Sequence, residues 1–368
     1  MNMLTKFAVT NYRGFAKRIE WDLSHTSNYT FNTNAIKDGI IKDGIVYGPN
    51  GSGKSNLALA LFDIVNHLSQ NWKKPDYYNN FVFAGNPFAP VLFEYSFCLG
   101  GYDIVYTYSK NVKGMLISEK LSVNNKEIFH RSDGDFSIDK TAYPMDPTIS
   151  ANLANNANHV SIVNFLLTSY PLPENHYLIL LQQFVNSMLW FKCLDTREFI
   201  GLENKVVNLD EYIIDHHLTD DFSGFITKVS NQHFSFAVPS EHDKILYCDY
   251  EKSKIPFDQI ASTGTQSLML LYYWIKEMHR ASFVFIDEFD AFYHFRLSFE
   301  VCKQLFALNC QAFVSSHNTY LMTNDLLRPD CNFILTDNKI KPLNECTEKE
   351  LRFGHNIEKM FRGGTFAV

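Results

Sequence analysis

Residues 48–55 are Gly-Pro-Asn-Gly-Ser-Gly-Lys-Ser, which match the G-x-x-x-x-G-K-S/T pattern of a phosphate-binding loop. The glycines let the backbone curl, so that successive N–H groups and the start of the following helix face an anionic phosphate. The Lys54 ammonium should then reach the β- and γ-phosphates of ATP, and the Ser55 hydroxyl should ligate Mg²⁺. The predicted nucleotide-binding residues of the loop are Asn50, Gly51, Ser52, Gly53, Lys54 and Ser55.

The sequence on either side of this loop has the strand and the helix that a phosphate-binding loop requires. Residues 44–47 form a short apolar run before the loop, and residues 56–68 have apolar side chains at helical spacing after it. We therefore predict a strand, the loop and a helix in this order. The alternative interpretation, a plain glycine-rich turn, requires neither element.

A second apolar run ends in two carboxylates. Residues 283–286 are Phe-Val-Phe-Ile, and Asp287 and Glu288 follow them. Together with a phosphate-binding loop, this pattern predicts that Asp287 holds Mg²⁺ through its water shell. Glu288 would then be the general base that polarises the attacking water. The alternative is a strand that simply ends in an acidic turn.

Two further segments carry residues suited to contact a terminal phosphate. Residues 262–266, Ser-Thr-Gly-Thr-Gln, lie at the start of a helix predicted over 265–278, and such a helix start attracts anions. An ordinary N-cap by Ser262 is the alternative. A strand predicted over 312–314 is soon followed by His317, whose neutral imidazole can hydrogen-bond a γ-phosphate. A solvated surface histidine is the alternative there.

The order of these four motifs resembles the head of an ATP-binding-cassette (ABC) ATPase, and the resemblance covers most of the chain. It implies an α/β fold of the P-loop NTPase, ABC-ATPase head type, with a mixed sheet, an antiparallel β-subdomain and an inserted helical lobe. It also implies that ATP joins a homodimer or higher oligomer, because the signature segment of one protomer closes over the ATP of its partner. Matched to this sequence, the contacts in trans come from Ser262, Gly264 and Gln266, and the D-loop begins at Asp290. A Q-loop glutamine has no match between residues 71 and 181.

Three other segments are similar to one branch of these ATPases. Residues 7–15 resemble the first strand and turn of the SMC, RecF and OLD group, which implies that Arg13 lies near the nucleotide. Residues 287–294 and the tail 352–364 resemble segments of AbiL/RloA-type prokaryotic anti-phage defence ATPases. Such proteins usually act as sensors beside a separately encoded effector. For the tail, a helix docked on the sheet edge is the alternative interpretation.

Changes of periodicity divide the chain into four segments. They are an N-terminal lobe with the P-loop and an antiparallel meander, a mainly helical insertion, a C-terminal lobe with the remaining motifs, and a tail. The predicted bounds of these segments are 1–150, 151–240, 241–350 and 351–368. An asparagine-rich stretch over 152–158 marks the first boundary.

Turn signals and apolar spacing predict the elements within these segments. The N-terminal lobe should have a hairpin over 3–23 and the meander over 91–138. The predicted helices of the insertion are 160–167, 174–191 and 209–218. In the C-terminal lobe, the helices 265–278 and 296–308 alternate with apolar strands at 283–286, 312–314 and 333–335. This alternation implies a sheet covered on both faces.

Composition restricts the classes of protein and of partner. The formal net charge of −7 provides no basic field for nucleic acid, so any DNA contact must be local. Seven cysteines, an odd number without a C-x-x-C pair, argue against a disulfide framework and a zinc finger. An acidic cluster with two histidines at 210–221 is interpreted as a solvated helix end, with a metal site as the alternative. No apolar stretch is long enough to cross a membrane, and we expect a cytoplasmic protein.

These observations favour an ATP-binding and ATP-hydrolysing switch that dimerises on ATP in anti-phage defence. It would control a separately encoded effector, a nuclease or a TOPRIM-type protein, with a nucleic acid or a phage protein as the trigger. The 51 residues after His317 are too few for a nuclease domain. A RecF-like DNA-repair clamp would instead bind DNA in a salt-sensitive way. A scaffold with structural ATP would show negligible turnover.

Overall fold

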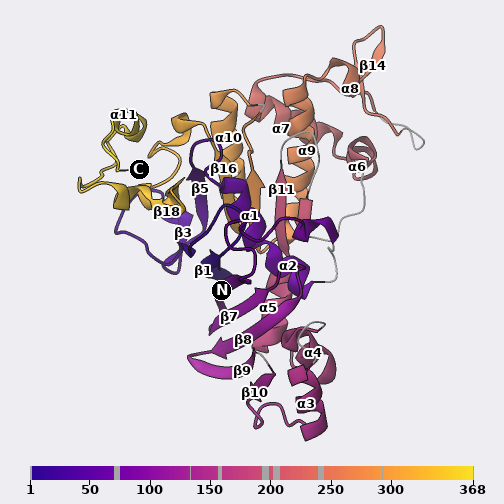
Figure 1. Cartoon of the computed structure of the whole chain (residues 1–368). Helices are drawn as coiled ribbons and strands as arrows, with labels where there is room; N and C mark the ends of the chain where they lie inside the picture. Colours follow the sequence, from indigo (N-terminus) through magenta and orange to yellow (C-terminus); the bar gives the residue numbers. More distant parts are fainter. Residues whose placement is uncertain are drawn as a thin grey trace.

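The computed structural model describes residues 2–69, 75–132, 134–155, 160–192, 199–201, 208–238, 244–291 and 293–367. Two seven-stranded sheets form the body of the molecule. Figure 1 shows one sheet below the other, with a small hairpin projecting at the upper right and the C-terminal segment at the left. The P-loop NTPase fold of the ABC-ATPase head type is thereby confirmed.

The central sheet contains the strands that precede the P-loop, the acidic pair and His317. Its strand order is β12-β11-β15-β16-β5-β17-β18, with five parallel inner strands and an antiparallel strand at each edge. Its strands are β5 (Asp43–Tyr47), β11 (Met188–Lys192), β12 (Phe199–Gly201), β15 (Phe283–Asp287), β16 (Gln311–Ser316), β17 (Asn332–Thr336) and β18 (Lys339–Pro342). Because the inner strands are parallel, their carboxyl ends meet at one edge, where ligands bind in open α/β sheets.

The second sheet is antiparallel throughout. Its order is β10-β9-β8-β7-β6-β1-β2, so the predicted N-terminal hairpin and the predicted meander are confirmed and share one sheet. Its strands are β1 (Asn2–Thr10), β2 (Ile19–Asp22), β6 (Val91–Leu99), β7 (Tyr102–Lys110), β8 (Leu116–Val123), β9 (Lys126–Ser132) and β10 (Asp135–Ile138).

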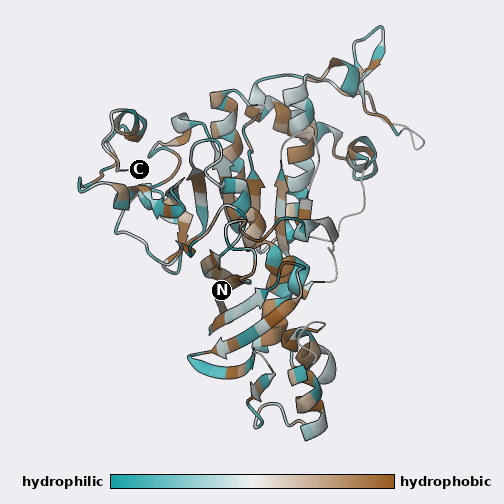
Figure 2. Ribbon diagram, viewed as in Figure 1, coloured by the Kyte–Doolittle hydropathy of each residue, from teal (hydrophilic) through white to brown (hydrophobic). Residues whose placement is uncertain are grey.

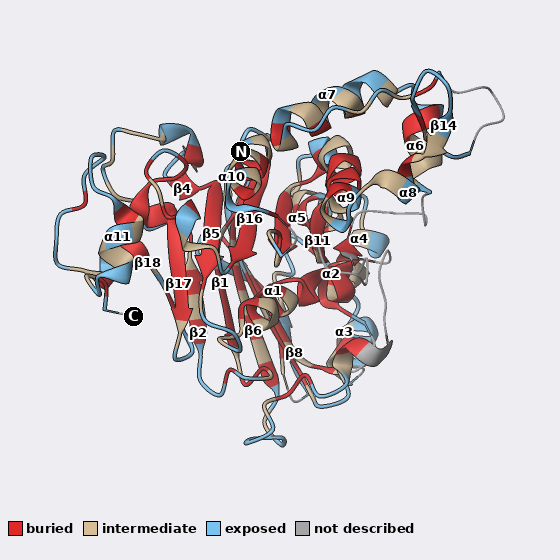
Figure 3. Cartoon of the chain, turned by 90° about the horizontal axis from the view of Figure 1, so that it is seen from above, coloured by how far each residue is buried: buried red, intermediate tan, exposed pale blue. Residues whose placement is uncertain are grey.

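Aromatic side chains pack the two sheets together. Trp21 of β2 lies edge-on to Phe285 of β15 and to Phe313 of β16, with ring centroids 6.3 and 4.8 Å apart. The side-chain amide of Gln311 also hydrogen-bonds both the N–H and the carbonyl of Leu4 in β1. Figure 2 shows apolar residues in the strands of the central sheet, and Figure 3 shows that its inner strands, such as β5, β16 and β17, are largely buried. The central sheet, whose edge carries the motifs, is therefore packed against the antiparallel sheet.

Helices flank the sheets. They are α1 (Lys54–Leu61), α2 (Asp63–Leu68), α3 (Pro147–Asn155), α4 (Ile162–Ser169), α5 (Tyr177–Asn186), α6 (Leu209–Asp215), α7 (Thr219–Ser230), α8 (Phe257–Ile260), α9 (Thr263–Glu277), α10 (Phe295–Phe306) and α11 (Ile357–Arg362). The remaining short strands are β3 (Ile36–Lys37), β4 (Ile40–Ile41), β13 (Tyr247–Asp249) and β14 (Lys254–Pro256).

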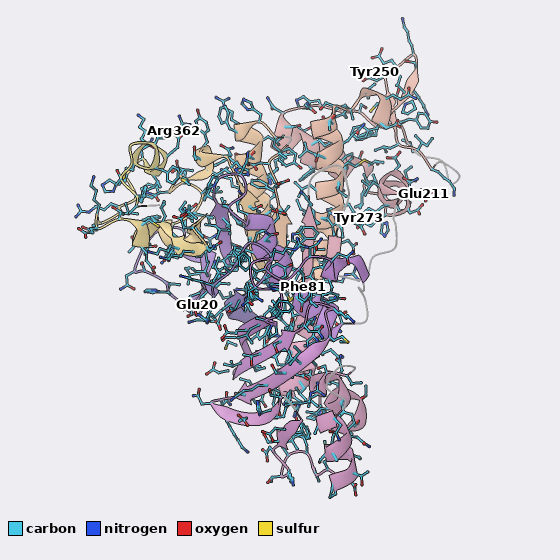
Figure 4. All side chains as sticks on the ribbon, in the orientation of Figure 1. Glu20, Phe81, Glu211, Tyr250, Tyr273 and Arg362 are labelled. Atoms are coloured by element: carbon cyan, nitrogen blue, oxygen red, sulfur yellow. The ribbon has the colours of Figure 1, made fainter. Side chains whose placement is uncertain are left out.

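A second, smaller hydrophobic core lies outside the sheets. It is formed by residues of α6, α7, α8, α9 and β13, with Phe222, Phe257 and Tyr272 among its buried side chains. We call residues 244–260, which include β13, β14 and α8, the arm. The arm projects from the body in Figure 1, and Tyr250 lies near its outer end in Figure 4.

The structure corrects three predictions from the sequence. Residues 188–191 are a strand and not the end of a helix; β11 pairs with β15, so the segment 151–240 contributes to the central sheet. The single helix predicted over 56–68 is divided at Phe62 into α1 and α2. Residues 152–155 of the asparagine-rich stretch belong to α3, and the rest of that stretch lies outside the described residues. The predicted strands 283–286, 312–314 and 333–335 are confirmed.

Other predictions concern features of the whole chain. In the part of the chain that the structure describes, no helix combines the length and the apolar character that a membrane crossing needs. Six of the cysteines are free thiols, and Cys193 lies outside the described residues. The acidic cluster at 210–221 forms no metal site, because no described group of three His, Cys, Asp or Glu residues could hold an ion.

Candidate functional site

The phosphate-binding loop connects β5 to α1, as predicted. Gly53 has a φ of +102°, and a Cβ atom there would lie 2.9 Å from the Phe15 ring. At Gly48 a Cβ atom would lie 2.5 Å from the carbonyl oxygen of Leu335. Only glycine fits either position without displacing its neighbours. The turn before β2 and the end of β17 therefore determine the path of the loop.

Lys54 extends back into the loop. Its Nζ donates hydrogen bonds to the carbonyl oxygens of Gly48 at 2.8 Å and Pro49 at 3.3 Å, and its side chain is buried. Burial lowers the pKa of Lys54, while the carboxylates of Asp287 and Glu288 raise it. An anionic oxygen forms a stronger hydrogen bond with an ammonium than a neutral carbonyl does. The lysine is thus well placed to contact phosphate.

Asp287 ends β15 beside the loop and is fully buried. Its Oδ1 accepts a hydrogen bond of 2.6 Å from the Ser315 hydroxyl. Burial raises the pKa of Asp287, whereas hydrogen bonds from Ser315 and Ser55 lower it. Its Oδ2 is buried without a partner at hydrogen-bond distance among the described residues.

The pair Ser55 and Asp287 fits Mg²⁺. One hydroxyl and one carboxylate are hard oxygen ligands, and Mg²⁺ is usually held by one or two carboxylates together with substrate phosphates. The buried and unpartnered Oδ2 of Asp287 is the kind of atom that a cation would satisfy. Ser55 and Asp287 are therefore the residues that would hold the ion.

Glu288 and Asp290 follow β15 directly. Glu288 has a φ of +50°, its N–H donates to the Ser315 hydroxyl at 2.8 Å, and its Oε2 lies 3.4 Å from the Lys192 Nζ. The carboxylate of Asp290 accepts a 2.6 Å hydrogen bond from the Ser316 hydroxyl, and burial raises its pKa. The two acidic residues are thus held at the strand edge by β16 and β11.

His317 follows β16 and is exposed. Partial desolvation of the ring and the nearby Lys54 ammonium lower the pKa of His317, and the carboxylates of Asp290, Glu288 and Asp287 act in the opposite direction. These mutual effects place the histidine in the same electrostatic environment as the loop lysine and the acidic residues. The structure thus brings together four of the predicted site residues: Lys54, Asp287, Glu288 and His317.

Arg13 also lies close to the loop. Its Nη1 donates to the Oδ1 of Asn56 at 3.3 Å, and Asn56 directly follows Ser55 on α1. The arginine has a φ of +44° in the turn between β1 and β2. This is the same turn that presses Phe15 against Gly53. The Arg13 side chain therefore lies beside the first turn of α1, and its contact with the nucleotide stays a prediction.

The residues predicted to form the signature segment lie at the tip of α9, in the lobe that carries the arm. The Ser262 hydroxyl caps the helix by accepting from the N–H of Thr265. The side-chain amide of Gln266 donates to the carbonyl of Asp258 at 3.0 Å. Ser262 and Gln266 are exposed, and Gly264 is half-buried. Their side-chain hydrogen bonds stay within the lobe and leave the tip open to solvent.

The C-terminal tail lies next to the phosphate-binding loop. A cavity of about 530 Å³ is lined by Gly48, Pro49, His317 and Phe361, among others. Helix α11 buries Ile357, while Met360 and Phe361 are only partly buried. The tail thus contains a docked helix, and Phe361 of this helix lines the same cavity as the phosphate-binding loop.

Sequence reasoning missed Ser315 and Lys192. Ser315 bonds both Asp287 and Glu288, and Lys192 pairs with Glu288. For Ser315 the signal was a polar residue at the end of the apolar strand that follows the acidic strand in the sequence. Lys192 was assigned to no element, because the run before it was interpreted as a helix.

The topology and the site define a P-loop ATPase domain of the ABC class. Residues 45–323 match the family model described as "AAA domain, putative AbiEii toxin, Type IV TA system". The chain belongs to this family.

Comparison with other proteins gives distant structural neighbours. Among solved structures, the SMC head domain from Thermotoga maritima has a TM-score of 0.43 and 15% identity, over 92% of this chain and 98% of that chain. An Smc head domain with an extended coiled coil, bound to the C-terminal domain of ScpA from Pyrococcus furiosus, has a TM-score of 0.44 and 12% identity, over 94% and 98%. No curated protein gives a significant match.

Proposed function

We propose that this chain is an ATP-binding and ATP-hydrolysing switch whose ATP-bound form is a dimer. The observation that carries the proposal is the convergence of Lys54, Asp287 and Glu288 at the loop, while the tip of α9 stays exposed elsewhere in the same chain. A P-loop with adjacent strand-end carboxylates supports ATP hydrolysis. An exposed serine-glycine helix start supports contact with a phosphate held by another copy.

Residues of the P-loop and of the adjacent strand ends would have separate roles in ATP hydrolysis. The Lys54 ammonium would bind the β- and γ-phosphates, and the neutral His317 would hydrogen-bond the γ-phosphate. Glu288 would accept the proton of the attacking water while the water oxygen bonds to the γ-phosphorus and the bond to the leaving ADP oxygen breaks. Ser55 and Asp287 would hold Mg²⁺, which would supply positive charge to offset the charge of the triphosphate.

The dimer would be completed by Ser262, Gly264 and Gln266 of the second copy. These residues are accessible at the start of a 15-residue helix, whose N–H groups and dipole favour an anion. Because the bound triphosphate would link two copies, hydrolysis would release them. The dimer would therefore form when ATP is bound and dissociate after ATP is hydrolysed.

We further propose that the switch controls a separate effector, a nuclease or TOPRIM-type protein, in anti-phage defence. The family description, which names a toxin of a type IV TA system, supports this context. The resemblance of residues 352–364 to defence ATPases supports it independently. A nucleic acid or a phage protein would be the trigger.

The test replaces Glu288 with Gln and measures mass by size exclusion with light scattering. With ATP and Mg²⁺, Glu288→Gln should stay dimeric, because binding is intact and hydrolysis is slow. Lys54→Ala should stay monomeric, since it lacks the main phosphate contact. A monomeric Glu288→Gln protein that still binds ATP would refute the dimer. Phosphate release by the wild-type chain tests hydrolysis, and salt-sensitive DNA binding would favour a DNA clamp instead.

A further inference from the structure

Strand β11 brings a basic residue to the same edge as the acidic pair. It lies parallel to β15, and Lys192, its last residue, is in register with Asp287. The Lys192 Nζ lies 3.4 Å from the Oε2 of Glu288, with side chains that are 27% and 29% exposed. The ammonium thus lies at the open edge of the sheet, one strand beyond the acidic residues.

Glu288 is held from two directions. Its backbone N–H donates to the Ser315 hydroxyl, which fixes the main chain at a φ of +50°. Its carboxylate forms an ion pair with Lys192, the one salt bridge of Glu288 among the described residues. Ser315 therefore holds the backbone of Glu288, and Lys192 holds its carboxylate.

We propose that Lys192 is a positioning residue for Glu288, and this inference rests on the proposed ATPase function. A protonated lysine has donors and no acceptor, so it cannot take the proton of water itself. It can hold one carboxylate oxygen and leave the other directed toward the water.

A plain surface ion pair is the competing explanation. Partly exposed pairs contribute little to stability, so such a pair could be lost without consequence. The two explanations differ in what they predict for kinetics. A positioning role lowers kcat and leaves KM unchanged, because the carboxylate acts on water and not on bound ATP.

The experiment measures steady-state ATP hydrolysis by the full chain and by Lys192→Ala, Lys192→Met and Lys192→Arg. We expect the Ala and Met variants to lose about 10- to 100-fold in kcat with KM unchanged, as for other residues that orient a catalytic group. Lys192→Arg should restore most of the rate, because it keeps the positive charge. The matched control is Lys120→Ala, which breaks the Lys120–Glu127 pair of 2.8 Å on the meander and should change neither constant.

Three results would overturn the inference. These are an unchanged kcat in Lys192→Ala, a change confined to KM, and an equal loss in Lys192→Arg. Thermal unfolding of each variant shows that it is folded, and Lys192→Met keeps the aliphatic stem where Ala does not. Wild-type chain that fails to hydrolyse ATP would refute the proposed function itself. Active wild-type chain with unaffected Lys192 variants would refute only the role of Lys192.

Discussion

Ser315 connects two adjacent strand ends of the site. Its hydroxyl donates to Asp287 at 2.6 Å and accepts from the N–H of Glu288 at 2.8 Å, and its side chain is fully buried. A single oxygen thus orients the proposed Mg²⁺ ligand and the backbone of the proposed general base. Removal of the hydroxyl would leave both groups without this partner.

We therefore predict that Ser315→Ala lowers kcat for ATP hydrolysis and destabilises the fold. Leaving a buried donor and a buried acceptor without a partner costs about 1–3 kcal/mol. Urea unfolding measures the stability, and phosphate release measures kcat. Ser298→Ala is the matched control, because Ser298 is also fully buried and its hydroxyl makes one hydrogen bond with the described residues, at 3.4 Å to the carbonyl of His294. Equal effects of both substitutions would refute the special role of Ser315.

The residues of the site differ in how well sequence predicts them. Lys54, Asp287 and Glu288 lie in motifs that predict their roles, and the two carboxylates are close enough to Lys54 to raise its pKa. Lys192 lies in no motif. Its relation to Glu288 depends on β11 pairing with β15, and strand pairing between distant segments is not encoded in local spacing.

At the scale of elements, α2 is joined to the antiparallel sheet by buried polar groups. His67 of α2 is stacked on Tyr108 with centroids 4.1 Å apart, and its Nε2 lies 2.7 Å from the Tyr106 hydroxyl. Burial lowers the pKa of His67 well below its usual range, and the charges of Lys110 and Arg131 lower it further. The native contact therefore requires a neutral imidazole.

This contact predicts a loss of stability in mild acid. In the unfolded chain His67 gains a proton near pH 6.5, whereas the folded chain excludes that proton. The contribution is therefore complete above pH 6.5 and is lost as the pH falls below it, by at most about 1.4 kcal/mol per pH unit. Calorimetry between pH 8 and 5 should show a steeper decline of Tm for wild type than for His67→Gln. Parallel curves would refute the prediction.

Element prediction succeeded where apolar runs were bounded by turn residues and failed where they were not. The strand before the loop and the one ending at Asp287 are short and lead directly into a motif. Residues 188–191 are all buried and follow a helix after a single residue, Ser187. A fully buried strand has no alternation, so periodicity cannot separate it from the helix before it.

At the scale of the whole molecule, assembly should depend on the tip of α9. We predict that Gly264→Asp, combined with Glu288→Gln, abolishes the ATP-dependent dimer and leaves ATP binding by the single chain unchanged. An aspartate in the first turn of a helix favours the helix, so the fold should persist, but its charge repels a triphosphate. Light scattering with ATP measures the dimer, and nucleotide fluorescence measures binding.

The control for this prediction is Asn164→Asp, which adds the same charge in the first turn of α4. That variant should dimerise like the parent Glu288→Gln protein. A dimer that survives Gly264→Asp would show that the helix tip does not face the nucleotide of a second copy. If the Gly264→Asp variant instead loses ATP binding as a monomer, the tip of α9 contacts the nucleotide bound by the same chain.

The arm is continuous with this helix tip. Helix α8 ends at Ile260, two residues before Ser262, and the carbonyl of Asp258 accepts the side-chain amide of Gln266. The arm therefore connects the tip of α9 to an outer end that projects into solvent. In the proposed ATP-bound dimer, a protein that binds this outer end would contact a segment that leads directly into the dimer contact.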